Sequence, residues 1–332
     1  MITSRWRRGL GAFAAPVRND VAVSAEGRLA AHLAGAYDIS VSRIGALDSG
    51  VFRVDRSDGP SWIARVFPPV RALEGAEGDA AILRALERAG FPAERCAHSN
   101  ATSIFEEQGV LVSEFVEPAS PLRPGRAAAI LGALLGRLHA SPGSGVREGG
   151  AWHHLSFVGG PREEIAAARE RLEDAQSRVG LRELDAYHRV CDAVEALDDC
   201  HDLAHAFVHP DFVSVNAIPT TDERLVIVDW TGAGRGPRLW SLGFLLWACG
   251  NRSPRLVDAV VSRYRTHVTL EPDELARLAA AIRGRAVTLE CWAFCAGRRA
   301  LAETAERVET ARKVADAIAV HAHRAFEKGD GT

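Results

Sequence analysis

The sequence predicts an α+β fold with two lobes: a small N-terminal lobe with an antiparallel sheet and one helix, and a larger, mainly helical C-terminal lobe. At 332 residues, the chain exceeds the length at which one hydrophobic core usually keeps growing. Short strand-forming runs separated by turn residues fill its first part, whereas helical periodicity dominates from Pro118 onward. We therefore expect one domain at residues 1–116 and a second at residues 117–332.

The N-terminal lobe is predicted to contain a three-stranded meander followed by a hairpin. Residues 57–60 (Ser-Asp-Gly-Pro) supply turn chemistry inside the meander, and Gln108–Gly109 is the expected turn of the hairpin. A helix that stops at Gly90 separates the two, and Ser24 predicts the cap of a flanking helix. The expected strands are residues 41–47, 50–56, 61–67, 102–106 and 110–116, and the expected helices are residues 24–37 and 76–89.

The C-terminal lobe begins where three prolines interrupt regular structure, at positions 118, 121 and 124. Apolar residues then recur at helical spacing almost to the end of the chain. Two short strands, at residues 214–218 and 225–229, are expected to interrupt the helices. The expected helices are residues 125–140, 161–177, 181–200, 239–249, 254–267, 272–296 and 299–327.

The composition argues against nucleic acid and membrane as binding partners. The 40 basic and 43 acidic side chains give a formal net charge of −3, which provides no broad positive surface for nucleic acid. Because no apolar run reaches the length of a membrane span, no membrane partner is expected either. The six cysteines are too sparse for a disulfide scaffold, so we expect reduced thiols and a cytoplasmic protein. The composition leaves the oligomeric state open.

One segment concentrates the residue types that phosphoryl transfer requires. It contains His209, Asp211 and Asn216, and Asp229 follows at the end of an apolar strand. Phosphoryl transfer needs a carboxylate to accept or orient the proton of the acceptor hydroxyl, and oxygen ligands to hold Mg²⁺ against the phosphates. Asp211 suits the first role, and Asn216 and Asp229 suit the second. A turn cap and an ordinary strand end would explain Asp211 and Asp229 separately, but not the combined spacing.

The pattern His209-x-Asp211-x₄-Asn216, followed by Val228-Asp229-Trp230, resembles the aminoglycoside phosphotransferase-like family, which includes choline, homoserine and macrolide kinases. The resemblance implies a protein-kinase-like fold and a small-molecule kinase that uses ATP or GTP with Mg²⁺. It also implies that Asp211 is the catalytic base, that His209 belongs to the catalytic motif, and that Asn216 and Asp229 are the magnesium ligands.

The same resemblance extends to the N-terminal lobe. It implies that Ser49 and Gly50 approach the nucleotide phosphates through their backbone, and that Arg65 stands where the family has a phosphate-gripping lysine. A carboxylate on the next helix is expected to pair with Arg65. The pattern leaves Asp79, which aligns best, and Glu77 both open for this role.

A strand further along resembles the hinge of the family. The apolar run at residues 110–117 would meet the adenine edge through backbone groups near Glu114, Phe115 and Val116. An apolar strand of this kind is also ordinary core in many proteins. Its place in the order of motifs is what favours the hinge interpretation.

Three departures from the family pattern support an alternative function. Besides Arg65, Pro210 replaces a common glycine of the loop, and Ser241 replaces an aspartate that braces it. These residues are compatible with a catalytically weak or inactive homologue that binds a nucleotide or another ligand. The intact base and both metal ligands favour an enzyme instead.

The acceptor is the least determined element. Residues 271–332 carry equal numbers of acidic and basic side chains, so they do not single out a polycationic aminoglycoside. An amino alcohol, another antibiotic or a neutral metabolite stays open. An apolar acceptor pocket could involve the C-terminal lobe tryptophans Trp152, Trp240, Trp247 and Trp292.

The spacing of three histidines also suggests a metal site. His201, His205 and His209 recur every four residues beside Cys200, a spacing that would place three rings on one face of a helix. Residues 206–208 instead read as a strand that enters the loop, which would scatter the rings. We therefore do not expect a zinc site here.

Overall fold

The computed structural model describes residues 24–71, 73–141, 147–150 and 159–327, and they form an α+β fold as predicted. They divide into two compact units. The first comprises residues 24–118 together with residues 226–228, and the second comprises the described parts of residues 119–225 and 229–327. No helix among these residues is long and apolar enough to cross a membrane.

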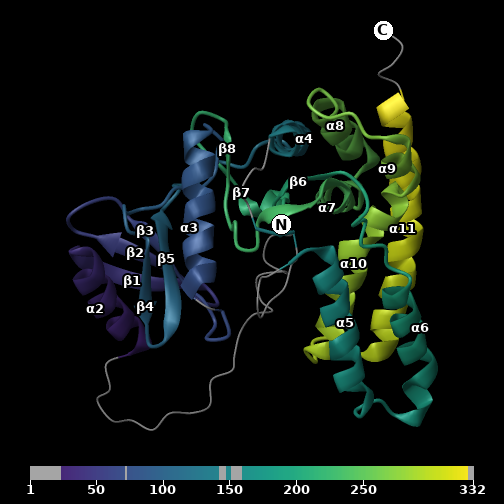
Figure 1. Cartoon of the computed structure of the whole chain (residues 1–332), viewed down its shortest axis with the longest axis horizontal. Coiled ribbons are helices and arrows are strands. Elements are labelled where there is room, and N and C mark those ends of the chain that lie inside the picture. The colour runs from purple at the N-terminus through teal and green to yellow at the C-terminus, as the bar shows by residue number, and fades with distance from the viewer. Residues whose placement is uncertain (1–23, 72, 142–146, 151–158, 328–332) are drawn as a thin grey trace. The chain divides into compact units, whose positions relative to one another are not determined.

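The first unit is built on one five-stranded antiparallel sheet with the strand order β1-β2-β3-β5-β4. Figure 1 shows the helix α2 on one side of this sheet and α3 on the other. Ser24 caps α2 by accepting a hydrogen bond from the Gly27 N–H (3.1 Å). The strands are β1 (Val41–Asp48), β2 (Val51–Arg56), β3 (Trp62–Val66), β4 (Thr102–Phe105) and β5 (Gln108–Glu114), and the helices are α2 (Ala25–Tyr37) and α3 (Leu73–Arg88).

The turn of the β4–β5 hairpin differs from the sequence prediction. It lies at Glu106 and Glu107, not at Gln108–Gly109, and both glutamates have a positive φ (48° and 65°). A two-residue hairpin turn that matches the twist of the strands requires positive φ at both positions. The prediction failed because glutamate is not a usual residue for this turn. Gly109 lies inside β5, next to Phe67 and Ala76.

The second unit is mainly helical, and two of its predicted helices are interrupted. Residues 181–200 form a short 3₁₀ turn and then α6, and residues 272–296 break at Arg277 into α9 and α10. Arg277 leaves the helical conformation (φ −100°, ψ 6°). The helices are α4 (Pro124–Ala140), α5 (Pro161–Gln176), α6 (Leu184–Glu195), α7 (Arg238–Gly250), α8 (Pro254–Tyr264), α9 (Pro272–Ala276), α10 (Leu278–Cys295) and α11 (Leu301–Glu327).

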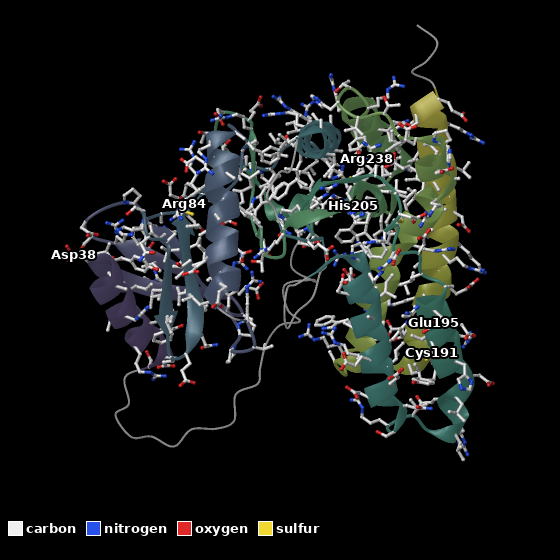
Figure 2. All side chains as sticks on the ribbon, viewed as in Figure 1. Asp38, Arg84, Cys191, Glu195, His205 and Arg238 are labelled. Carbon is white, nitrogen blue, oxygen red and sulfur yellow. The ribbon has the colours of Figure 1, made fainter. Side chains whose placement is uncertain are left out.

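A small antiparallel sheet inside the second unit pairs β6 (His205–Val208) with β9 (Gly234–Pro237). Figure 2 shows Arg238, the first residue of α7, close to His205 at the start of β6. The sequence did not predict β9, because Gly-Arg-Gly-Pro contains no strand-forming side chain. Its first glycine is required by packing, since a Cβ on Gly234 would lie 2.4 Å from the carbonyl oxygen of Arg147.

The chain between these two strands contains the loop that carries the predicted motif. Residues 214–216 form a 3₁₀ turn rather than the predicted strand, and only β7 (Ala217–Pro219) is extended. The next strand is β8 (Leu225–Ile227). Its last residue belongs to the first unit, where the Ile227 N–H donates to Pro92 O (2.8 Å) and the Glu94 N–H donates to Ile227 O (2.9 Å).

Close packing of α4 against α8 supports the second unit. A Cβ on Gly132 would lie 2.3 Å from the carbonyl oxygen of Val260, so the two backbones meet without a side chain between them. About two turns later, His139 Nδ1 and the Tyr264 hydroxyl are hydrogen-bonded at 2.9 Å. His139 is fully enclosed, and burial lowers its pKa to about 3, so the ring is neutral.

We predict that Gly132→Ala lowers the free energy of unfolding by about 1–3 kcal/mol, because α4 and α8 must separate to admit the methyl group. Urea denaturation measures the change. The matched control is Gly125→Ala in the first turn of the same helix, where nothing lies within 4 Å of the added Cβ. It should change stability by less than about 1 kcal/mol. Equal effects of the two substitutions would contradict the packing argument.

Candidate active site

The loop at residues 209–216 begins with a fully buried histidine. The His209 ring packs edge-to-face against Trp230 (4.7 Å between ring centroids) and Phe212 (5.8 Å). Its Nδ1 accepts a hydrogen bond from the Asp211 N–H at 3.0 Å. Since Nδ1 is the acceptor, the neutral ring carries its proton on Nε2. In this geometry, His209 fixes the backbone of Asp211.

The structure brings Asp211 and Asn216 into direct contact. The Asn216 Nδ2 group donates to the Asp211 backbone oxygen (2.9 Å) and to its carboxylate Oδ2 (2.7 Å). The 3₁₀ turn makes this possible, because it folds the chain back so that the Asn216 N–H also donates to Val213 O (3.0 Å). With Nδ2 turned toward Asp211, Oδ1 is the Asn216 atom that could face a cation.

Asp229 lies directly after β8 and has a left-handed backbone (φ 66°). This conformation costs a residue other than glycine about 1–2 kcal/mol, although aspartate tolerates it better than most. Its neighbour Trp230 is buried between the 209–216 loop and β6, stacked on Phe207 (6.1 Å, 10°) and edge-to-face with His209. Trp230 therefore fixes the chain next to Asp229 against the loop.

The environment of Asp211 raises the pKa of its carboxyl group to about 6. Burial is the main cause, and the negative charge of Asp229 adds to it. The charge of Arg285 and the hydrogen bond from Asn216 act in the opposite direction and stabilise the carboxylate. The carboxylate is thus ionised at neutral pH, with a proton affinity well above that of an ordinary aspartate.

Two residues from neighbouring helices contact this loop, and sequence reasoning found one of them, Ser241, but not the other, Arg285. The buried Arg285 of α10 donates from Nη2 to Pro210 O (2.5 Å), and its Nη1 pairs with Glu164 of α5 (3.0 Å). From α7, the Ser241 hydroxyl donates to His209 O (3.2 Å). The available signal was an arginine within an apolar stretch of α10, where Ile282 and neighbouring residues are also buried.

The predicted phosphate-binding residues of the first unit lie in the β1–β2 turn. Gly50 has φ 68°, and a Cβ there would lie 2.5 Å from Val66 O on β3, so the fold of the hairpin itself requires glycine. The Ser49 N–H donates to Asp48 Oδ1 (2.7 Å). The geometry of the turn itself therefore accounts for Ser49 and Gly50.

Arg65 lies on β3, paired with Val51 of β2 and Leu111 of β5. Strand alternation places its side chain on the same face as Phe67. Phe67 lies beneath α3, since the Cβ direction of Gly109 meets Phe67 together with Ala76 and Leu73 of that helix. Arg65 thus shares the α3 face of the sheet.

Of the two candidate partners of Arg65, Asp79 is 1% exposed and Glu77 is exposed, which favours Asp79. Asp79 also has a partner that the sequence did not reveal. Arg71 is buried, donates to Asp79 Oδ2 (2.5 Å), and lies over the Phe67 ring at 4.5 Å. A pairing of Asp79 with Arg65 stays a prediction.

The predicted hinge residues lie at the end of β5. The Glu114 N–H donates to Arg95 O (2.8 Å), and the Phe115 N–H donates to Ser61 O (3.1 Å). The Glu114 side chain is exposed, and Val116, beyond the strand, is half-buried. Of these residues, Val116 is the one whose N–H could bond an adenine ring, because the other two N–H groups are already bonded.

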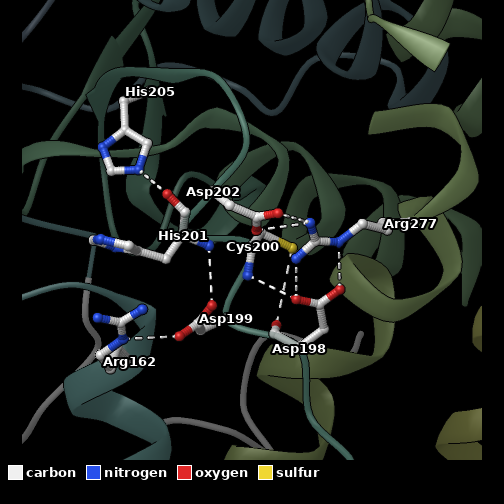
Figure 3. Close-up of polar contacts among 8 residues, drawn as sticks. All are labelled: Arg162, Asp198, Asp199, Cys200, His201, Asp202, His205 and Arg277. Carbon is white, nitrogen blue, oxygen red and sulfur yellow. Dashed lines mark hydrogen bonds and ion pairs between the residues drawn. The ribbon is translucent and has the colours of Figure 1, made fainter. Parts of the chain in front are cut away.

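Figure 3 shows the surroundings of the histidines that first invited a metal-site interpretation. Arg277 pairs with Asp198 and with Asp202, and Asp199 accepts from the His201 N–H (3.0 Å). His205 Nε2 contacts the backbone oxygen of His201 (2.8 Å). These contacts tie the segment before β6 to the junction of α9 and α10. Among the described residues, no three His, Cys, Asp or Glu side chains are grouped to hold a metal ion.

The tryptophans proposed for an acceptor pocket have different positions. Trp240 is part of the core between α5, α6, α10 and α11, whereas Trp152 lies outside the described residues. Trp292 is half-buried and lines a cavity of about 10 Å³ together with Glu164 and Thr288. That volume holds about one water molecule, not an acceptor.

Comparison with known proteins assigns the family. Residues 38–281 match the phosphotransferase enzyme family, so the chain belongs to that family, as the resemblance of its motifs suggested. Comparison with curated proteins gives no significant match.

Solved structures show the protein-kinase-like fold. Amicoumacin kinase, in complex with AMP-PNP, Ca²⁺ and Ami, is similar with a TM-score of 0.63 at 15% identity, covering 86% of this chain and 93% of that one. Choline kinase from Streptococcus pneumoniae gives 0.60 at 16% identity, covering 87% and 98%. An aminoglycoside phosphotransferase from Alicyclobacillus acidocaldarius gives 0.58 at 15% identity, covering 96% and 99%.

We predict that Asp211→Asn stabilises the fold at high pH and not at low pH. Because the pKa of about 6 in the folded state lies above the reference value of 3.8, burying the carboxylate costs free energy above pH 6, and this cost disappears below about pH 4. The free energy of unfolding should rise by up to about 3 kcal/mol at pH 8 and change little near pH 4. Urea denaturation at the two pH values measures both.

The control for this experiment is an exposed carboxylate with the opposite shift. The hydrogen bonds from Thr220 and Arg224 lower the pKa of Asp222. Asp222→Asn should therefore lower stability, if at all, at pH 8 rather than at low pH. A destabilised Asp211→Asn variant at pH 8 would mean that the charge of Asp211 is not buried at a cost.

Proposed function

We propose that this protein is a small-molecule kinase that transfers the γ-phosphoryl group of ATP or GTP to a hydroxyl group of its acceptor. The observation that carries the proposal is the orientation of Asp211. Its backbone N–H is bound by His209, its carboxylate by Asn216, and its pKa of about 6 suits a group that takes up a proton near neutral pH. Membership of the phosphotransferase enzyme family supports this assignment.

The second unit, within the predicted domain at residues 117–332, would supply the chemistry. Asp211 is the proposed base that orients the acceptor hydroxyl and receives its proton, and His209 holds the backbone of Asp211 in place. Asn216 Oδ1 and the Asp229 carboxylate are hard oxygen donors of the kind that Mg²⁺ prefers, so the donor set fits this ion. Bound Mg²⁺ would neutralise charge on the phosphates during transfer.

The first unit, within the predicted domain at residues 1–116, would bind the nucleotide. Arg65 is the proposed phosphate-binding cation, with Asp79 as its carboxylate partner on the α3 face of the sheet. The β1–β2 turn at Ser49 and Gly50 would cover the phosphates. The Glu114 carbonyl and the Val116 N–H would meet the adenine edge.

The acceptor is proposed to be an aminoglycoside-like compound, an amino alcohol or another hydroxyl-bearing antibiotic or metabolite. Similar structures include a choline kinase and an aminoglycoside phosphotransferase, at identities too low to choose between them. A screen of choline, aminoglycosides and macrolides with labelled ATP and GTP tests the proposal directly. Transfer to any hydroxyl compound would support it.

A second candidate function is a nucleotide- or ligand-binding homologue with weak or no catalysis. The specific observation behind it is that a neutral hydroxyl, Ser241, contacts the 209–216 loop from α7 at 3.2 Å. A protein of this kind would bind nucleotide with Mg²⁺ and transfer nothing to any acceptor in the screen.

We predict that Asp211→Asn and Asp229→Ala fail in different ways. Asp211→Asn should lower kcat by at least about 10²-fold and leave Mg²⁺-dependent nucleotide affinity nearly unchanged, because the base acts on the acceptor. Asp229→Ala should weaken nucleotide binding in the presence of Mg²⁺ and not in its absence, because it removes the anionic ligand. Calorimetry with and without Mg²⁺ separates them. Near-normal turnover of Asp211→Asn would exclude this base.

We predict that Arg65→Ala costs about 1.5–3 kcal/mol in nucleotide affinity or transition-state stabilisation, because a charge-assisted phosphate contact is lost. Arg65→Lys should recover part of this loss, since lysine keeps the charge but not the planar fork. Calorimetry and steady-state kinetics on the same preparations measure both. Arg43→Ala on β1, which β2 separates from β3 in the same sheet, is the control and should change neither quantity. Full activity of Arg65→Ala would remove Arg65 from the phosphate site.

A further inference from the structure

A single peptide group of the 209–216 loop is held at both of its polar atoms. The peptide between Pro210 and Asp211 offers its carbonyl oxygen to Arg285 Nη2 (2.5 Å) and its N–H to His209 Nδ1 (3.0 Å). Because a trans peptide is planar, with its C=O and N–H pointing in opposite directions, these two bonds fix the plane from opposite edges. This plane fixes the N–Cα bond of Asp211, so that only the rotation φ about this bond remains to set the direction in which the side chain leaves the backbone.

The guanidinium that holds the carbonyl oxygen is itself oriented from another helix. Arg285 Nη1 pairs with Glu164 Oε2 at 3.0 Å, and the Thr288 hydroxyl donates to the other oxygen of Glu164 at 2.6 Å. The Arg285 and Glu164 side chains are only 1% and 4% exposed. The planar fork of arginine can thus reach Glu164 and Pro210 at once, which a single ammonium group does less well.

Fold stability alone does not account for this pair. Buried ion pairs carry a large desolvation cost, and well-packed apolar side chains of similar volume often stabilise a fold equally or better. From α7, a neutral hydroxyl, that of Ser241, donates to the carbonyl oxygen of His209 (3.2 Å). A charge-assisted bond is about twice as strong as a neutral one, so Arg285 provides the firmer of the two contacts.

We propose that Arg285, oriented by Glu164, is a positioning residue for phosphoryl transfer that fixes the Pro210–Asp211 peptide and thereby the direction of the Asp211 carboxylate. The proposal rests on the proposed function, because it assigns Arg285 a role in that reaction. It also explains how the loop keeps its geometry with Ser241 in α7, since the principal contact comes from α10 instead.

The test removes the ion pair without leaving a buried charge. In the double variant Arg285→Met/Glu164→Met both charges are replaced by flexible apolar side chains, so the fold should survive. We expect kcat to fall about 10- to 100-fold, the loss that corresponds to one charge-assisted hydrogen bond, and KM for the nucleotide to change less than about twofold. Arg285→Lys, which keeps the charge opposite Glu164, should recover part of kcat. A folded double variant with wild-type kcat would overturn the proposal.

The matched control is a second Arg–Glu pair in the same unit, in which Glu274 is buried and Arg238 is half-buried. Arg238 donates from Nε and Nη2 to Glu274 (2.7 and 2.5 Å) and also to Thr269 O (3.0 Å). Arg238→Met/Glu274→Met repeats the exchange of charge for apolar volume at the start of α7. We expect kcat within about twofold of wild type for a variant of comparable melting temperature. An equal loss of kcat in both double variants would reduce Arg285 to a structural residue and overturn the proposal.

Hydrogen exchange distinguishes failure of this inference from failure of the proposed function. Amide exchange in the segment around residues 208–213 should be at least about tenfold faster in the Arg285/Glu164 double variant and unchanged in the control, whether or not an acceptor is known. If the wild-type protein transfers no phosphoryl group, the proposed function fails. Amide exchange then still tests whether Arg285 fixes the Pro210–Asp211 peptide. Unchanged exchange in a folded double variant would overturn the positioning role by itself.

Discussion

Two hydrogen bonds fix the peptide group between Pro210 and Asp211, and the arrangement around the 209–216 loop depends on this constraint. The buried ring of His209 binds the peptide N–H, and Trp230 packs against the same ring, so the residue after Asp229 is coupled to the histidine two residues before Asp211. Asn216 then folds back onto the fixed aspartate. The side chains of His209, Asp211 and Asn216 are thus aligned with respect to one rigid planar group, with little freedom left to each of them.

Arginine, rather than lysine, makes the polar connections of the helical unit. Three charged residues along α9, α10 and their junction contact different elements: Glu274 binds Arg238 of α7, Arg277 binds the segment before β6, and Arg285 binds α5 and the loop. The sequence contains only two lysines, Lys313 and Lys328. The planar guanidinium group carries several donors and can bind two partners at fixed angles, so one arginine side chain can connect two elements. This pair of helices therefore forms the frame that supports the loop.

Much of the fold and the order of the motifs could be predicted from the sequence, because they depend on local patterns. The strands of the first unit follow alternation and turn residues, and the motif from His209 to Asn216 has a fixed spacing. The failures occur where distant contacts override local preference. Strand β9 exists because it pairs with β6, although its own residues do not favour a strand. Arg285 was missed because its carboxylate partner, Glu164, is distant in sequence and becomes a neighbour only after folding. Arg71 was missed although Asp79 is only eight residues away, because the chain between them turns from the end of the sheet into α3.

Residues 226–228, which include the end of β8, belong to the first unit and also determine when that unit can be completed. Ile227 bonds to Pro92 and Glu94, so the last backbone contacts of the N-terminal sheet unit wait for a segment that the ribosome makes far later. During synthesis, the early chain must stay partly formed while most of the helical unit is still emerging. Contacts of such high sequence separation slow folding and expose unsatisfied backbone to competing partners. A nascent chain of this protein is therefore most vulnerable to misassembly between the synthesis of its first unit and that of β8.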